Sequence, residues 1–439
     1  MMKSPITFFL LAFFVSVSSM VSAQEKLELS MEQARQYALN NNTDIKNSIL
    51  SLESANKKIW ETTAIGLPQV TAKAAYQNIF KVPTVMFGDP NDPNTQEIAL
   101  GVKENTTVDF TVSQLLFSGA YIVGLQASRI YYQLSNQSLT KTRTEIVETI
   151  NDTYTMILVA EESSKILRDN LTNVSKTLDE IKAMHQEGFV EITDVDQLEL
   201  SLNSIKNSLA QVDNNTDLGY RLLKIQLGID PAQQIVLTNK LEEVVNVDAI
   251  SNAISSEFNI EKNIDFQLVK TQEKLALLDL RRERTEYLPT VSAFYNRTEK
   301  MNKPEFDFAP KDVFGVNVSL PIFSSGQRMA KVSQKKLAYK QVQNSREFVS
   351  RSLSLQAQQY QYDLGIKMSM YQNQKKSMDL SKQIYERTLL KYKEGVSSSM
   401  DLMNAQNQYL LSLSSYYQSI FDMIKSKNKL DKTFSNYAL

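Results

Sequence analysis

The sequence predicts a mainly α-helical chain with a small β part, built from two copies of a unit that reads helix, strand, strand, very long helix, helix. Three observations predict this fold class. Only 12 of the 439 residues are glycine and 10 are proline, so we expect long elements with few tight turns. Polar and apolar residues alternate in a few short stretches, which is the period of a strand. The same landmarks also occur twice along the chain at nearly constant spacing.

The first 23 residues have the pattern of a secretory signal peptide. A basic start that ends at Lys3 precedes the apolar segment Ile6 to Val17, and the small residues before Gln24 end at Ala23. This order matches a signal that is cleaved, here after Ala23. We therefore expect an exported mature chain. An uncleaved membrane anchor is disfavoured because its apolar stretch would need to be longer.

Each copy begins with a helix that leads to a Leu-Pro pair. Asp44 lies 24 residues before Pro68 in the first copy, and Asp265 lies 24 residues before Pro289 in the second. An alternating stretch follows each proline. The equal spacing indicates that the two helices, and the strands after them, correspond to each other.

Two strands are predicted in each copy, at about 67–82 and 103–117 in the first and at about 288–300 and 310–323 in the second. In the stretches Val108 to Ser113 and Phe314 to Leu320, apolar residues alternate with polar ones. This is the pattern of a strand that has an apolar environment on one face and water on the other. The first copy has 15 extra residues between its strands, and the prolines and aspartates of residues 82–101 predict a long, turn-rich loop there.

A very long helix follows the second strand of each copy, after a Phe-Ser-Gly junction at Phe117 or a Phe-Ser-Ser-Gly junction at Phe323. No proline occurs in residues 94–230 or 322–439. About 70 residues of helix, at about 1.5 Å each, would extend on the order of 100 Å, so the chain should be elongated. A heptad seam of coiled-coil type is made of Leu167, Leu171, Val174, Leu178, Ile181 and His185.

Each long helix is expected to end at a glycine, Gly188 or Gly395, and an aspartate follows six residues later, Asp194 or Asp401. A second helix then returns from the turn. We therefore divide the mature chain into a first repeat at 24–230, a linker at 231–247 in which Pro231 breaks the helix, and a second repeat at 248–439.

The composition excludes several kinds of site. There is no cysteine and one histidine, His185, which rules out disulfide scaffolds, cysteine nucleophiles and multi-histidine metal sites. The 48 basic and 49 acidic residues give a net charge of −1, so no basic surplus points to nucleic acid. The sequence has no phosphate-binding loop, metal cluster or pair of catalytic carboxylates. We predict neither an enzyme nor a cofactor.

Four strands per chain cannot close a useful membrane barrel, because eight is already the small case whose interior is filled by side chains. Open sheet edges are not tolerated in lipid either, since their backbone groups would lack partners. If the strands lie in an outer membrane, several chains must share one sheet, with alternate polar residues facing a common lumen. The long helices would continue the tube away from the membrane.

The signal peptide, the duplicated helix and Leu-Pro strand, the Phe-Ser-Gly junction and the Gly-x5-Asp turn together resemble the TolC-type outer-membrane efflux proteins (outer membrane factors). The resemblance extends from about Leu29 to Phe434. It implies a homotrimer that forms a twelve-stranded outer-membrane β-barrel continued by a periplasmic α-helical barrel. The linker at 231–247 would lie in an equatorial band around this tube.

On this resemblance the periplasmic gate lies at the two tip turns, Gly188 and Gly395. Family channels typically carry aspartates after the second turn, which narrow the pore and favour cations. Asp401 matches the first such position, and Asn404 stands where a second aspartate can occur. A ring of three carboxylates, one from each chain, would still attract cations.

In well-known members the closed state is held by a tyrosine and an arginine near the second turn, which link to the first-repeat aspartate. Tyr392 fits the tyrosine and Asp194 fits its partner, whereas Ser397 occupies the arginine position. The charged half of that lock is therefore absent from this sequence.

Simpler explanations compete for several of these residues. A carboxylate in the first turn of a helix satisfies free backbone N–H groups, which would account for both Asp401 and Asp194 without a pore role. His185, at the position equivalent to Tyr392, is read as a packed or solvent-facing residue, with a pH-sensing gate as the alternative. Trp60 lies either at a membrane boundary or buried between helices.

The resemblance predicts a passive exit duct in the cell outer membrane, with a long periplasmic extension. It would serve a tripartite efflux pump or a type I secretion system that exports drugs, small molecules or proteins. The implied partners are a periplasmic adaptor (membrane fusion) protein, an inner-membrane RND or ABC-type pump and outer-membrane lipid, with no nucleic acid. A secreted or periplasmic coiled-coil scaffold without channel activity is the alternative.

Overall fold

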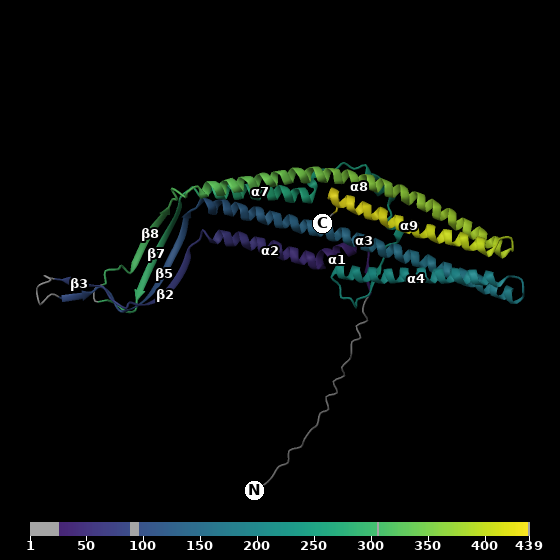
Figure 1. Cartoon of the computed structure of the whole chain (residues 1–439), viewed down its shortest axis with the longest axis horizontal. Helices are drawn as coiled ribbons and strands as arrows, with labels where there is room; N and C mark the ends of the chain where they lie inside the picture. The colour runs from purple at the N-terminus through teal and green to yellow at the C-terminus, as the bar shows by residue number, and fades with distance from the viewer. Residues whose placement is uncertain (1–25, 88–95, 305–306, 438–439) are drawn as a thin grey trace, which may run out of the picture.

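The computed structural model describes residues 26–87, 96–304 and 307–437. The predicted signal peptide at 1–23 lies outside these residues. The molecule is a long rod, with a sheet at one end and two helix–helix turns at the other (Figure 1). The prediction of a mainly helical chain with a small β part is confirmed.

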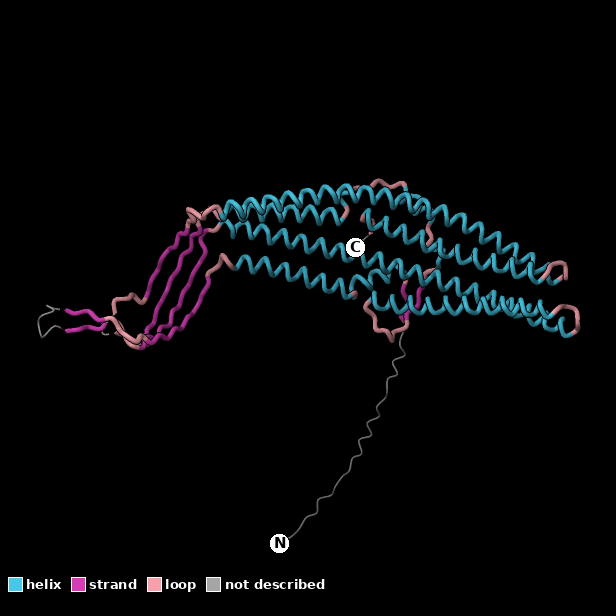
Figure 2. The backbone as a smooth tube through the Cα atoms, viewed as in Figure 1, coloured by secondary structure: helices cyan, strands magenta, loops and turns pink. Residues whose placement is uncertain are grey.

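The helices of the two copies have nearly equal lengths. α2 (Thr43–Ala64) and α7 (Ile264–Thr285) have 22 residues each. The long helices α3 (Gly119–Gln186) and α8 (Gln327–Lys393) have 68 and 67 residues, and the returning helices α4 (Ile192–Leu227) and α9 (Ser399–Phe434) have 36 each. The long helices extend from the sheet to the tips (Figure 2). Each of these three helices of the first copy therefore has a counterpart in the second.

Two equivalent asparagines fix the starts of α2 and α7. The side-chain oxygen of Asn42, and likewise that of Asn263, accepts hydrogen bonds from two backbone N–H groups in the first turn of its helix. The amide nitrogen of Asn42 donates to the carbonyl of Gln226 at 2.7 Å, and that of Asn263 to the carbonyl of Thr433 at 2.8 Å. In each copy, one side chain thus joins the start of a short helix to the last turn of a returning helix.

The four-stranded sheet is antiparallel throughout. Its strands, in spatial order, are β2 (Gln69–Asn78), β5 (Glu104–Phe117), β7 (Thr290–Lys300) and β8 (Asp312–Ser319). Neighbouring strands place Thr71 opposite Thr111 on one face and Val70 opposite Val112 on the other, so the alternation in the sequence corresponds to two different faces. β2 and β8 are the edges, and neither has an outer neighbour in the part of the chain that the structure describes.

The structure corrects three details of the predicted strands. β2 ends at Asn78 and not near 82. The segment 82–101, expected to be a turn-rich loop, contains a second hairpin that extends beyond the sheet, with β3 (Thr84–Phe87) paired to β4 (Gln96–Ala99). These strands have four residues each, too few to show a clear alternation beside the turn residues. β8 ends at Ser319, before the predicted limit of 323, because Pro321 has no N–H to donate to a ladder.

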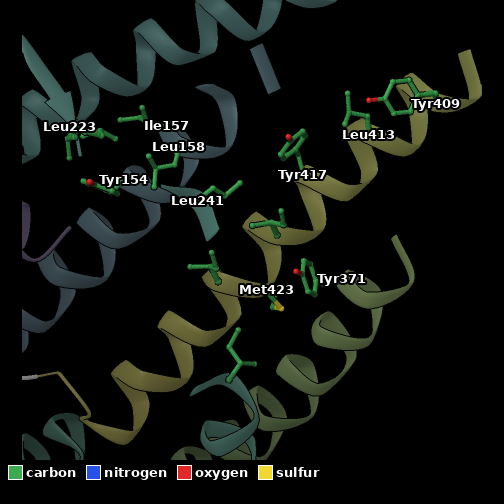
Figure 3. Close-up of a cluster of buried hydrophobic side chains, with 14 of the residues drawn as sticks. Tyr154, Ile157, Leu158, Leu223, Leu241, Tyr371, Tyr409, Leu413, Tyr417 and Met423 are labelled. Carbon is green, nitrogen blue, oxygen red and sulfur yellow. The ribbon is translucent and has the colours of Figure 1, made fainter. Parts of the chain in front are cut away.

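Short elements lie around the middle of the rod. They are β1 (Leu27–Leu29), which pairs in parallel with β6 (Ile235–Leu237), and α1 (Met31–Asn41), α5 (Leu241–Val244), α6 (Val247–Ile254) and the 3₁₀ helix η1 (Ile260–Lys262). The largest buried apolar cluster joins this region to the long helices, and Figure 3 shows part of it, with Tyr154 and Leu223 from the first copy and Tyr371 and Met423 from the second. No helix among the described residues is long and apolar enough to cross a membrane.

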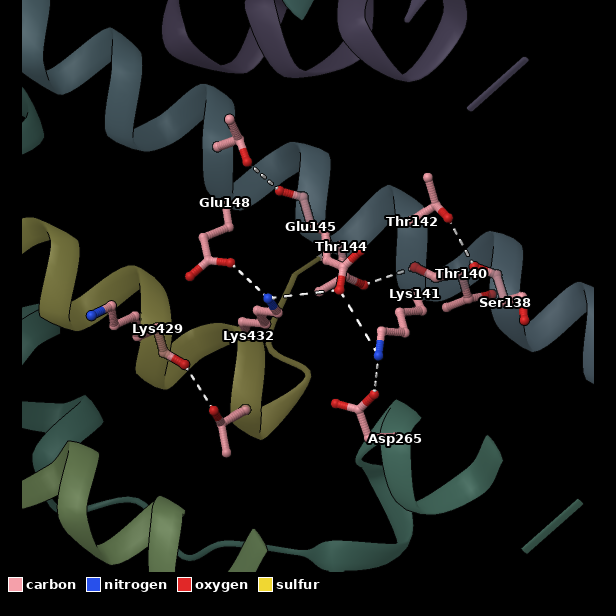
Figure 4. A network of polar contacts seen from close by, with 12 residues as sticks. Ser138, Thr140, Lys141, Thr142, Thr144, Glu145, Glu148, Asp265, Lys429 and Lys432 are labelled. Carbon is pink, nitrogen blue, oxygen red and sulfur yellow. Dashed lines mark hydrogen bonds and ion pairs between the residues drawn. The ribbon is translucent and has the colours of Figure 1, made fainter. Parts of the chain in front are cut away.

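Alternating charges join α3 of the first copy to α7 and α9 of the second (Figure 4). The Nζ atom of Lys432 lies 2.9 Å from a carboxylate oxygen of Glu148 and 4.0 Å from one of Glu145. Lys141 lies 3.9 Å from Glu145 and 2.6 Å from Asp265. Burial acts to lower the pKa of Lys432, but the hydrogen bond and charge of Glu148 outweigh it, so the pKa is raised.

Candidate functional site at the helical tips

The far end of the rod consists of two turns with the same geometry. Gly188 and Gly395 have φ angles of +79° and +72°, in the left-handed region that favours glycine. In both turns the glycine N–H bonds to the carbonyl three residues earlier, and the next N–H bonds to the carbonyl five residues earlier. This is the Schellman arrangement that ends a helix. Both glycines therefore end the long helices α3 and α8.

The helices that leave the two turns begin differently. Ser398 caps α9, because its hydroxyl accepts from the N–H of Asp401 while the Asp401 carboxylate accepts from the N–H of Ser398 at 3.2 Å. The hydroxyl of Ser398 also donates to the Asp401 carboxylate at 2.7 Å, and this bond, together with the one from the Ser398 N–H, lowers the pKa of the Asp401 carboxyl. Glu191 holds the equivalent position before α4 and makes no side-chain cap bond. The capping explanation is thus confirmed for Asp401.

The helices α3 and α4 form one helical hairpin, and α8 and α9 form the other. The carboxylate of Asp194, in the first hairpin, faces the second. Asp194 lies in the first turn of α4, yet its carboxylate accepts a hydrogen bond from the hydroxyl of Ser399, the first residue of α9. The capping explanation is wrong for Asp194, because the side chain bonds across to α9. The Oγ atom of Ser399 also lies 2.7 Å from Oε1 of Gln197, one turn further along α4. Ser399 therefore connects the starts of the two returning helices.

Tyr392 lies in the last turn of α8, and its side chain is buried, with 9% of the residue exposed. Its hydroxyl oxygen has no hydrogen-bond partner among the described residues. Burial raises the pKa of Tyr392 to about 12, with a further contribution from the negative charge of Asp194. The link between Tyr392 and Asp194 that the resemblance implied is not formed in this structure, although Asp194 is close enough for its charge to act.

Further polar contacts connect the hairpins near the tip. The hydroxyl of Ser201 on α4 donates to Oε1 of Gln406 on α9 at 2.6 Å, and both residues are buried. The amide nitrogen of Gln406 has no partner within the described ranges. Lys393, at the end of α8, forms an ion pair of 3.0 Å with Glu180 on α3. The tip is therefore held by a few polar contacts in addition to apolar packing.

The remaining predicted residues lie around these contacts. Asn404 is exposed on α9, one turn after Asp401, which is also exposed. His185 is half-buried, and its Nδ1 lies 2.9 Å from the carbonyl oxygen of Val190, so Nδ1 carries the hydrogen, because a carbonyl only accepts. Trp60 is 64% exposed and is not buried between helices of its own chain. No group of three or more His, Cys, Asp or Glu residues in the described part of the chain is placed to hold a metal ion.

This arrangement of a sheet, two long helical hairpins and two equivalent tips matches known proteins. The sequence profile of the family described as outer membrane efflux protein matches residues 34–224 and 260–432. The chain belongs to this family.

Two relatives of this efflux protein align over nearly its whole length. The outer membrane protein TolC of Vibrio cholerae is 19% identical over 414 residues, which cover 92% of this chain and 89% of the relative. The probable outer membrane lipoprotein SilC of Salmonella typhimurium is 22% identical over 409 residues, covering 89% and 81%.

Solved structures show the same fold. CusC superposes with a TM-score of 0.75 at 14% identity, over 92% of each chain. The outer-membrane channel CmeC of Campylobacter jejuni superposes with a TM-score of 0.72 at 17% identity, over 92% of this chain and 85% of CmeC. The efflux protein is thus an exit duct in the outer membrane with a periplasmic extension, as predicted, and the alternative of a coiled-coil scaffold is not supported.

Proposed function

We propose that three copies of this efflux protein form one continuous tube, and that the open edges of the sheet carry the assembly. β2 and β8 have 10 and 8 residues, and each can accept a further strand. The four strands alternate in direction, so β8 of one copy meets β2 of the next in antiparallel orientation. Three copies would supply twelve strands and leave no unpaired edge in lipid.

The two faces of the sheet have the chemistry that such a barrel needs. Lys73, Asp109 and Thr298 are aligned across three strands on one face. Val112 and Tyr295 are aligned on the opposite face. In the proposed barrel the first face borders a water-filled lumen and the second borders lipid.

The helical part also has a surface that suits a second copy. α8 carries a stripe of exposed apolar side chains at helical spacing: Phe348, Leu355, Tyr362, Ile366 and Met370. A contiguous exposed apolar surface typically marks an interaction site. A neighbouring copy packed along α8 would cover this stripe and continue the tube as an α-helical barrel in the periplasm.

We place the gate of the duct at the tips, at Gly188 and Gly395. Movement of one hairpin away from the other must break the contact between Asp194 and Ser399. Asp401 and Asn404, both exposed on α9, would line the constriction, with Tyr392 in the adjoining helix end. Three Asp401 carboxylates around one axis would attract cations and repel anions.

The partners follow from the passive character of a duct. Energy would come from an inner-membrane RND or ABC-type pump, and a periplasmic adaptor protein would connect this pump to the tips. The whole assembly would be the tripartite efflux or type I secretion system in which this chain is the outer-membrane component. Exported compounds would cross the outer membrane without release into the periplasm.

Conductance of the purified protein tests this proposal. The chain has no cysteine, so the variant Ser201→Cys/Gln406→Cys introduces one pair of thiols, on facing positions of α4 and α9 near the tip, and no other. We expect a trimeric mass in detergent, ion conduction in planar bilayers, and a conductance that falls on oxidation of the double variant and recovers on reduction. Ser201→Cys alone should not respond. A monomer that conducts no ions would contradict the proposal.

A further inference from the structure

The two copies differ in charge where their helices meet the sheet. The first 20 residues of α8, at 327–346, include six basic residues and no acidic one. The first 20 residues of α3, at 119–138, include one basic residue and no acidic one. The last turns of α7, which packs against α8, add three arginines and two glutamates. The second copy therefore presents a surplus of positive charge at this level of the rod.

Contacts with the linker elements mark one side of α7 and α8. Lys270 on α7 forms an ion pair of 2.8 Å with Glu261 in η1. The side-chain amide of Gln361 on α8 donates to the carbonyls of Ile254 and Ser256, where α6 ends. A duct needs an open lumen, so in the proposed tube the side that carries α6 and η1 is the outer one.

Three basic residues near the sheet lie on this outer side. Arg281 and Arg284 follow Lys270 by 11 and 14 residues, which is about three and four helical turns. Lys336 precedes Gln361 by 25 residues, which is about seven turns. At about 1.5 Å per residue, the three lie within roughly 14 Å of the helix ends that join the sheet. All three are exposed, and none forms an ion pair among the described residues.

The repeat places the single tryptophan at the same level. Trp60 and Arg281 each stand eight residues before the proline of a Leu-Pro pair, so they occupy equivalent positions near the ends of α2 and α7. Trp60 is 64% exposed, and next to the sheet Ile322 and Phe323 are 91% and 85% exposed. Tryptophan is enriched where a membrane meets water, and long basic side chains extend their charged ends into that zone. Apolar residues followed by aromatic and basic ones are the order expected across a membrane boundary.

We propose that an outer surface made of Arg281, Arg284, Lys336 and Trp60 binds the headgroups of anionic phospholipids in the periplasmic leaflet of the outer membrane. Charge complementarity identifies the occupant, because unpaired basic residues at a membrane surface attract lipids with a net negative charge. The guanidinium groups can also bind a lipid phosphate through two hydrogen bonds. A zwitterionic headgroup carries its own positive charge and gains less. This inference rests on the proposed tube and adds a preference among lipids to it.

The opposite side of the same two helices offers a matched control. Asp279 follows Lys270 by nine residues, about two and a half turns, so it lies away from the linker, and it forms an ion pair of 3.5 Å with Lys335. Arg282 lies one turn after Asp279, and Lys331 lies one turn before Lys335. Both are exposed and carry the same charge as the outer residues at similar heights. In the proposed tube they face the lumen and not the lipid.

Quenching of Trp60 fluorescence by brominated lipids measures which lipid adjoins this surface. In the proposed tube β8 of one copy meets β2 of the next, so Trp60 lies beside α8 of its neighbour. In proteoliposomes of phosphatidylglycerol and phosphatidylcholine, with bromine on one lipid at a time, we expect phosphatidylglycerol to be enriched at Trp60 by about fivefold at low salt and by less at high salt. Arg281→Gln/Lys336→Gln should bring the enrichment close to one. Arg282→Gln/Lys331→Gln, with the same loss of charge, should keep it.

The outcomes separate failure of this inference from failure of the proposed tube. Equal quenching by the two lipids in the wild type, or equal enrichment in the two double variants, would overturn the lipid preference and leave the tube in the membrane. Absence of quenching by either lipid would contradict the placement of the sheet in the membrane, and with it both proposals. Replacing chloride by phosphate at equal ionic strength should leave the enrichment unchanged, whereas its loss would assign the surface to free phosphate.

Discussion

The asparagine that joins α7 to α9 offers a direct test of how the second copy is held together. In Asn263→Ala the N–H groups of Asp265 and Phe266, in the first turn of α7, lose their acceptor, and the carbonyl of Thr433 loses its donor. Asn263 is 2% exposed, so water does not readily replace the lost bonds. Both losses therefore make the folded state less stable.

The magnitude follows from these two losses. Loss of an asparagine N-cap costs about 1 kcal/mol. A buried carbonyl left without a partner costs about 1–3 kcal/mol more. We therefore expect Asn263→Ala to destabilise the protein by roughly 2–4 kcal/mol. Asn42→Ala should have a similar effect, because Asn42 makes the same contacts in the first copy.

Thermal unfolding of the detergent-solubilised protein, followed by circular dichroism, measures the effect. Hydrogen exchange of the first turn of α7 should increase in Asn263→Ala and locate the damage. Asn259→Ala is the control, since this exposed residue caps the 3₁₀ helix with a single bond of 3.0 Å to the N–H of Glu261. If Asn263→Ala were no more destabilising than Asn259→Ala, the cross-helix bond would not have the importance assigned to it.

Three further changes test other contacts. Lys432→Met removes the ion-pair partner of the half-buried Glu148. The free energy of unfolding should therefore fall by about 1–3 kcal/mol at low salt and by less at high salt, which the melting temperature reports. Gly219→Val should cost about 1–3 kcal/mol in the same assay, because a Cβ there lies 2.8 Å from the Ile157 side chain. The pKa of Asp401 is lowered, so its contribution to stability is present above the ordinary aspartate pKa and is lost as pH falls; melting curves of Asp401→Asn should lack this component.

The sequence predicted the long elements because their signals are local. The absence of proline from residues 94–230, and the heptad spacing that includes Leu167 and Val174, describe a continuous helix, and α3 has 68 residues. Gly188 and Gly395 marked the tip turns because a left-handed residue is needed where each helix ends. Such features depend on neighbours in the chain, which a sequence shows directly.

The contacts of the tip were less predictable because they join distant segments. Ser399 and Asp194 are 205 residues apart, and Ser399 follows two other serines with nothing in its spacing to distinguish it. The repeat shows which positions correspond, but not which side chains meet across the hairpins. For the same reason the capping role fitted Asp401 and failed for Asp194, although both stand six residues after a glycine.

The two copies agree around the middle of the rod and differ at the tips, and this difference indicates where movement begins. Asn42 and Asn263 make equivalent contacts, whereas α9 begins with a complete capping box and Glu191, the residue before α4, makes no side-chain cap bond. Free N–H groups at an uncapped start are held only by their surroundings, so that start should open more easily. We expect faster hydrogen exchange at residues 192–195 than at 399–402 in the same protein, which makes α4 the side that moves first. Faster exchange at the start of α9 would reverse this assignment.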